Sequence, residues 1–215
     1  MTSNCPYVRG VTPRPRKPAT MPSGAFDRYA SGVDPAVSLQ IAHDTATALV
    51  RRIRESDDPA VLERLLAYTA DHGVGELAEL WSAAPAHSLP GALWRLYVIH
   101  ASIVADESFA AAAYDTGAAL EATADVVVAG APQPTSPDDI RELADEILRG
   151  AFHGDIGDAL DRAAAYCRIE ARGVTDIMGR SELGNSVLMQ RALTLTDFAN
   201  DLAASAKLDR TGELH

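Results

Sequence analysis

From residue 34 onward, three dipeptides place a proline directly after a side chain that can cap a helix. They are Asp34-Pro35, Asp58-Pro59 and Ser136-Pro137. Aspartate and serine at an N-cap accept a hydrogen bond from the first turn, and proline is tolerated at the first helical position. The 215 residues also include 39 alanines and few alternating apolar runs. The sequence therefore predicts an all-α fold, with helices almost throughout from residue 34.

Apolar residues at helical spacing predict where these helices lie. We expect seven to nine helices, packed around a central helix at 89–105 in which Arg95 is the only formally charged residue. A helix that is apolar nearly all round is typical of the centre of a fold. The expected ranges are 35–55, 59–71, 74–83, 89–105, 107–129, 137–149, 155–172 and 186–207, with a loop at 173–185.

Residues 1–33 differ from the rest of the chain in charge and in proline content. They carry a charge of +4, which leaves −15 for the remaining 182 residues from the total of −11. We expect a disordered or extended arm, in which Arg14, Arg16 and Lys17 could dock on an acidic surface or in an aromatic groove. Residues 34–215 are predicted to form a single helical domain, with a loop or a subdomain boundary at 130–137.

Motifs that define an enzyme class are not found in the sequence. It contains no phosphate-binding loop, no Gly-x-Ser-x-Gly elbow, no His-Glu-x-x-His and no Glu-x-x-His. Its two cysteines, Cys5 and Cys167, are too few for a disulfide framework or a four-cysteine zinc site. The sequence favours a non-enzymatic protein without a cofactor, and leaves open an enzyme whose site is assembled from distant residues.

His100 falls on the apolar stripe of the 89–105 helix, and Asp106 and Glu107 follow that helix directly. A buried imidazole needs a hydrogen-bond partner. His100 is therefore either a core residue bonded to a carbonyl or carboxylate, or part of a pocket with Asp106 and Glu107. The second alternative predicts a helical enzyme or a small-ligand-binding protein.

His153, Asp155 and Asp158 form the densest short cluster of potential metal ligands. Carboxylate oxygens and an imidazole suit a divalent cation. Aspartates at the start of the 155–172 helix would also cap that helix and complement its dipole. The cluster therefore predicts either a metal site or an ordinary helix start.

Leu188, Leu195 and Leu202 recur every seven residues in the last predicted helix, with alanines between them. Such a stripe packs either into the core of its own chain or against the same helix of a second subunit, about a twofold axis. In the second case Arg191 would lie at the rim of the interface. The leading hypothesis is a non-enzymatic interaction or regulatory protein that self-associates as a homodimer or binds another protein.

Charge and hydropathy also restrict the partners and the location. An acidic body repels nucleic acid and anionic membrane surfaces. No run of residues is long and apolar enough for a transmembrane helix. We therefore expect a cytoplasmic protein that binds neither nucleic acid nor a membrane.

Two segments of the chain resemble alanine-rich helical proteins of actinobacteria. They are Leu93-Trp-Arg-Leu-Tyr97 and Phe152-His-Gly-Asp-Ile-Gly-Asp-Ala-Leu-Asp161. The resemblance covers about residues 60–172 and contains no catalytic motif. It implies a bacterial, intracellular, helical protein and carries over no site residue.

Overall fold

A computed structural model describes residues 34–55, 80–120, 124–129, 136–180 and 186–215. Contacts between residues divide the chain into two units, Met1–Asp34 and Pro35–His215, and the described helices belong to the second unit. Several predictions lie outside the described residues: the arm with Arg14, Arg16 and Lys17, the helix at 59–71, most of the helix at 74–83, and the loop at 130–135.

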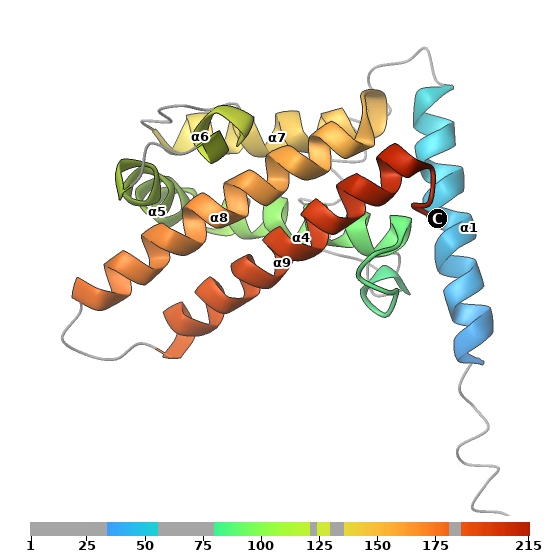
Figure 1. The fold of residues 1–215 in the computed structure, drawn as a ribbon, viewed down its shortest axis with the longest axis horizontal. Coiled ribbons are helices and arrows are strands. Elements are labelled where there is room, and N and C mark those ends of the chain that lie inside the picture. Colours follow the sequence, from blue (N-terminus) through green and yellow to red (C-terminus); the bar gives the residue numbers. More distant parts are fainter. Residues whose placement is uncertain (1–33, 56–79, 121–123, 130–135, 181–185) are drawn as a thin grey trace, which may run out of the picture. The chain divides into compact units, whose positions relative to one another are not determined.

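All of the regular secondary structure in the described ranges is helical (Figure 1). The prediction of an all-α fold is thereby confirmed for this part of the chain. The helices are α1 (Pro35–Arg54), α4 (Leu89–Ala105), α5 (Glu107–Leu120), α6 (Ala124–Ala129), α7 (Pro137–His153), α8 (Ile156–Arg180) and α9 (Ser186–Thr211).

A serine caps the start of two helices. At α4, the hydroxyl of Ser88 accepts a hydrogen bond from the backbone N–H of Gly91 at 3.3 Å. At α7, Ser136 and Asp139 form the predicted capping box, because each side chain accepts from the backbone N–H of the other, at 3.2 and 3.0 Å. These bonds satisfy N–H groups that have no partner inside a helix.

The most extensive contact between two helices is that of α8 with α9, which run side by side in opposite directions (Figure 1). α8 also contacts α4, α5, α6 and α7. Fourteen of its 25 residues are buried. This helix therefore lies against five other helices, and most of the fold is built around it.

α4 is the most apolar of the long helices, and it contacts α1, α5, α7, α8 and α9. Nine of its 17 residues are buried. Within the described residues, no single helix has both the length and the apolar composition to cross a membrane. α4 and α5 taken together are long and apolar enough, but the two helices meet at an angle of 108°.

The end of α8 corrects the predicted loop at 173–185. The helix continues through Gly173 as far as Arg180. A Cβ at Gly173 would collide with the carbonyl oxygen of Ala113, and a Cβ at Gly117 would collide with a carbonyl of α8. Gly173 is thus required for the close approach of α5 and α8, and it does not end the helix.

The predicted single helix at 107–129 is two helices in the structure. α5 ends at Leu120 and α6 begins at Ala124. α6 is tied to α8, because Asp125 accepts hydrogen bonds from Arg168 at 2.8 to 2.9 Å. These partners are far apart in the sequence, so helical periodicity alone could not show that the segment divides.

α7 extends from its predicted end at 149 to His153. The guanidinium of Arg54, from α1, donates to the carbonyl oxygens of Phe152 and Gly154 at 3.3 and 3.2 Å. The last carbonyls of a helix have no partner within it, so these bonds stabilise the additional turn.

Candidate functional site

His100 has a carboxylate partner within the fold. Its Nε2 lies 2.7 Å from Oδ1 of Asp145 on α7, and the imidazole is buried. Asp145 is also 3.8 Å from Arg149, one turn further along α7. This arrangement corresponds to the core alternative, in which the pair links α4 to α7.

Asp106 and Glu107 have partners of their own. Oδ1 of Asp106 accepts from the backbone N–H of Phe109 at 3.1 Å, so Asp106 caps α5. Oε1 of Glu107 accepts from Arg141 of α7, also at 3.1 Å. The two carboxylates therefore hold helix ends and helix pairs together, and neither they nor His100 line the grooves described below.

The cluster of His153, Asp155 and Asp158 has the contacts of a helix start. Oδ1 of Asp155 accepts from the backbone N–H of Asp158 at 3.0 Å, and Asp158 pairs with Arg210 of α9 at 3.3 Å. Within the ranges that the structure describes, no three histidine, cysteine, aspartate or glutamate side chains are grouped so that they could hold a metal ion.

The leucine stripe of the last helix faces its own chain. Leu195 is 7% exposed, Leu202 is fully buried and Leu188 packs half-buried against the same core. Arg191, which we expected at a subunit rim, pairs instead with Glu170 of α8. The large apolar side chains that α9 leaves exposed are different ones: Val187, Met189 and Leu193.

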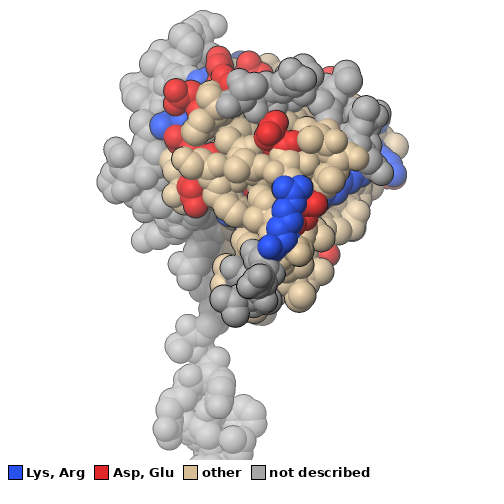
Figure 2. Space-filling model, turned by 90° about the vertical axis from the view of Figure 1, so that its left-hand side faces the viewer, with Lys and Arg blue, Asp and Glu red and all other residues tan. Residues whose placement is uncertain are grey.

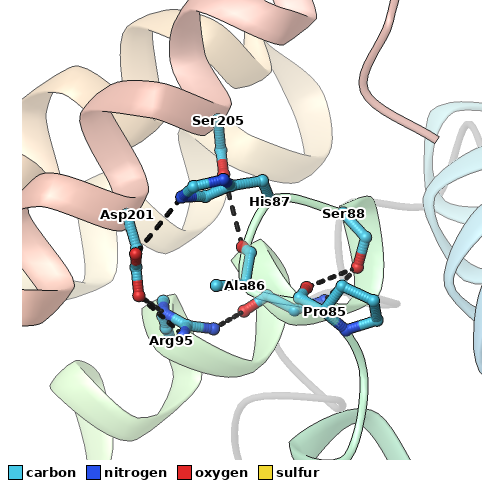
Figure 3. Close-up of polar contacts among 8 residues, drawn as sticks. Pro85, Ala86, His87, Ser88, Arg95, Asp201 and Ser205 are labelled. Carbon is cyan, nitrogen blue, oxygen red and sulfur yellow. Dashed lines mark hydrogen bonds and ion pairs between the residues drawn. The ribbon is translucent and has the colours of Figure 1, made fainter.

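An arginine–carboxylate pair joins α4 to the second half of α9. Nε and Nη2 of Arg95 donate to Oδ2 of Asp201 at 3.0 and 2.7 Å, and Nη1 donates to the carbonyl oxygen of Gly91 at 3.0 Å. Oδ1 of Asp201 lies 3.2 Å from Nε2 of His87, so this carboxylate sits between two basic side chains (Figure 3). The ring of Phe198 lies against the Arg95 guanidinium, 5.4 Å from its Cζ.

Two serines fix the loop that leads into α4. The hydroxyl of Ser88 donates to the carbonyl oxygen of Pro85 at 2.7 Å (Figure 3). The hydroxyl of Ser205, on α9, donates to the carbonyl oxygen of Ala86 at 3.4 Å. These two hydrogen bonds fix the backbone just before His87, whose side chain reaches Asp201.

A second arginine–carboxylate pair joins α8 to the first half of α9. Nε and Nη2 of Arg191 both donate to Oε1 of Glu170, at 3.1 and 2.5 Å. Glu170 is only 1% exposed, and the ring centroid of Phe109 lies 4.8 Å from Cζ of Arg191. Burial raises the pKa of Glu170, while the charge of Arg191 opposes that rise.

The buried neighbours of Glu170 on α8 are neutral. The ring of Tyr166 stacks on that of Tyr114 with centroids 5.5 Å apart. Burial, followed by the charge of Glu170, raises the pKa of Tyr166 and the pKa of the Cys167 thiol. Cys167 is therefore a protonated core residue, because reactive cysteines need a lowered pKa.

A groove of about 390 Å³ opens between α4 and α9, beside the Glu170–Arg191 pair. Both members of the pair contribute to its lining. A second and more polar groove shares Thr194 and Phe198 with the first. The apolar side chains that line the first groove are Val98 and Ile99 of α4 and Val187, Leu195 and Phe198 of α9.

Sequence patterns alone did not single out Glu170, although they contain a signal for it. Leu160, Ala163 and Cys167 follow one another at helical steps on the buried face of α8, and the next position on that face is Glu170. Charged side chains are almost never fully buried without a partner. A glutamate that interrupts an apolar helix face therefore predicts a buried ion pair, without identifying the partner.

Comparison of this chain with family models, with curated proteins and with solved structures gives no match. The resemblance of the 93–97 and 152–161 segments to actinobacterial helical proteins therefore leads to no family assignment. What the chain does has to be argued from its own geometry.

Proposed function

We propose that this chain is a non-enzymatic interaction protein of the cytoplasm that self-associates through the outer face of α9. We define the outer face as Met189 and Leu193, which are four residues apart and therefore neighbours on one side of α9. Val187 is exposed as well, but it lies on the side of the helix that lines the groove beside α4. Met189 and Leu193 are 53% and 54% exposed. This exposure carries the proposal, because neighbouring large apolar side chains in contact with water are typical of a protein interaction site.

The charge of the chain restricts where two copies can meet. Residues 34–215 carry −15, so two copies repel each other wherever their acidic surfaces meet. Between Ser186 and Thr196 the only charged residue is Arg191, which is paired with Glu170. Uncharged residues also predominate on the described surface in Figure 2, which faces the end of the molecule where α8 stops.

The size of the face limits how tight this association can be. Stable interfaces bury about 1,200–2,000 Å² in total, which two side chains cannot supply. Leu120 of α5 is 49% exposed, but the groove that it lines together with Thr196 of α9 also contains Arg168, Arg172 and Asp176, so it adds little apolar area. We therefore expect a concentration-dependent dimer about a twofold axis, not a permanent one.

Sedimentation of the full chain tests the proposal. The wild type should form a dimer at micromolar concentrations, and Leu193→Asp should be a monomer with unchanged helical circular dichroism, because its side chain is exposed. Ile41→Asp is the matched control, since Ile41 is 43% exposed on α1, and it should remain dimeric. A monomeric wild type, or a Leu193→Asp variant that dimerises as well as the wild type, would contradict the proposal.

Two alternative functions remain predictions and are ranked below self-association. The first alternative is a helical enzyme or small-ligand-binding protein with a pocket at His100, Asp106 and Glu107. The second is a divalent-metal protein that uses residues 153–161. The contacts of these residues favour structural roles. For the metal, thermal unfolding with added Mn²⁺ or Zn²⁺ is the test, because a cation that binds the native state raises the Tm, and Asp158→Ala should remove that rise.

A further inference from the structure

Folding alone does not explain why an ion pair is buried between α8 and α9. A buried pair is often no more stabilising than apolar side chains of the same size. Glu170 is 1% exposed, and yet both Glu170 and Arg191 contribute to the lining of the α4–α9 groove. The lining also contains the uncharged polar residues Ser102, Ser186, Gln190 and Thr194 beside its five apolar residues. Buried charged groups in the wall of such a cleft are typical of ligand-binding sites.

Arg191 keeps hydrogen-bonding capacity that the fold does not use. A guanidinium has five N–H donors. In the described part of the chain, its hydrogen bonds come from Nε and Nη2, and both go to Oε1 of Glu170. The Phe109 ring lies 4.8 Å from Cζ and orients the guanidinium, and the side chain is 24% exposed. Nη1 is therefore a positioned donor for a bound molecule.

The charge balance of the pair selects a neutral headgroup. Glu170 already compensates Arg191, so a carboxylate ligand would add an unbalanced negative charge beside Glu170. An ammonium ligand would bring a positive charge and only donors to a site whose free group is itself a donor. A carbonyl oxygen accepts a hydrogen bond from Arg191 and adds no net charge.

The remainder of the groove suits a small apolar body. Val98 and Ile99 form one wall, and Leu195 and Phe198 form the other. A volume of about 390 Å³ lies near the lower end of the range of about 300–1,000 Å³ found for ligand pockets. The ligand therefore has room for a short chain or a single ring beside its headgroup.

We propose that the α4–α9 groove binds a small neutral amphipathic molecule, whose carbonyl oxygen accepts a hydrogen bond from Arg191 and whose apolar body lies between α4 and α9. The site is separate from the contact proposed for self-association, because neither Met189 nor Leu193 is in the groove lining. Binding can therefore be measured in Leu193→Asp as well as in the wild type, and its outcome does not depend on whether the chain dimerises.

Three probes with the same alkyl chain test the headgroup: octanamide, octanoate and octylammonium. Isothermal titration calorimetry with the full chain should give saturable binding of octanamide, with a Kd about tenfold lower than for either charged probe. Equal binding of the three probes, tighter binding of a charged probe, or no saturable binding of octanamide would overturn the proposal.

Two variants test the location of the site. Val98→Trp fills the groove and should abolish octanamide binding. Arg191→Lys keeps a positive charge beside Glu170 but loses the planar donor group, and it should weaken octanamide binding about tenfold. Arg149→Lys, which changes an arginine outside the groove lining, is the matched control and should bind as the wild type does. Circular dichroism establishes that each variant is folded, and unchanged binding in a folded Val98→Trp would also overturn the proposal.

Discussion

Arg95 with Asp201 and Arg191 with Glu170 are two arginine–carboxylate pairs, one in each half of α9. In each pair, Nε and Nη2 of the arginine donate to one carboxylate oxygen, and the guanidinium lies against an aromatic ring. The carboxylates differ in exposure. The Asp201 side chain is 25% exposed and also meets His87, whereas the Glu170 side chain is 2% exposed.

This difference shows that hydrogen-bond geometry alone does not give the energy of an ion pair. If Arg95 is removed, water and His87 can still solvate Asp201. If Arg191 is removed, Glu170 is left almost fully buried without a counter-charge, and a lone buried charge is far more costly than an exposed one. Removing one partner of the Arg95–Asp201 pair should therefore cost little stability. Removing one partner of the Glu170–Arg191 pair should cost much more, because the remaining charge stays buried.

The largest effect is expected for Arg191→Ala. This change leaves Glu170 buried without its counter-charge, and we expect the free energy of unfolding at neutral pH to fall by about 3–5 kcal/mol. Urea unfolding followed by circular dichroism measures this loss. A loss no larger than that of Arg95→Ala would contradict the comparison between the two pairs.

Arg95→Ala should have a smaller effect. The substitution removes bonds to Asp201 and to the carbonyl of Gly91, but Asp201 remains accessible to water and close to His87. We expect a loss of about 1–2 kcal/mol in the same unfolding measurement. Raising the salt concentration should reduce this loss, because partly exposed pairs are screened.

Helix starts were the most predictable part of this fold. Ser136 with Asp139 formed the capping box that their spacing predicted, and α4 has the bounds that its apolar run predicted, Leu89–Ala105. Local chemistry decides such features, since the groups that interact are within one or two turns of each other. The end of α8 was not predictable in this way, because position 173 is a glycine to make room for the backbone of α5, which is distant in the sequence.

The candidate site was predictable only in part, for the same reason. The need of His100 for a hydrogen-bond partner followed from its place on an apolar helix face, but nothing local identified Asp145 as that partner. The seven-residue leucine spacing predicted a stripe that is covered by other residues. It could not decide between the core of the same chain and a second subunit as the cover. Glu170 and Arg191 are 21 residues apart and meet because α8 and α9 fold back on each other.

The dependence of stability on pH distinguishes the two pairs further. Burial raises the pKa of Glu170 above its ordinary value of 4.5. Between the unfolded and folded pKa values the native state holds a proton that the unfolded state has released, so the free energy of unfolding falls as the pH rises through this window. The contribution of Glu170 is thus fully present below about 4.5 and is lost above the pKa of the folded state.

Glu170→Gln isolates this contribution, because glutamine does not titrate. The stability of the wild type minus that of Glu170→Gln should decrease as the pH rises from 4.5 and then become constant. Urea unfolding at a series of pH values measures the difference. A difference that increases with pH would mean that Arg191 lowers the pKa of Glu170 by more than burial raises it.

The smallest effect on stability is expected when both members of the buried pair are replaced together. Glu170→Leu with Arg191→Met removes two charges and leaves apolar groups of similar length in a closed interior. Replacing a buried ion pair by apolar residues is often neutral or stabilising, so we expect the free energy of unfolding to stay within about 1 kcal/mol of the wild type or to rise. The same double variant should lose octanamide binding, because the donor in the groove is gone. Stability that persists while binding is lost would separate the two roles of the pair and show that its charges serve the groove. A loss as large as that of Arg191→Ala alone would show instead that the pair is required for the packing of α8 against α9.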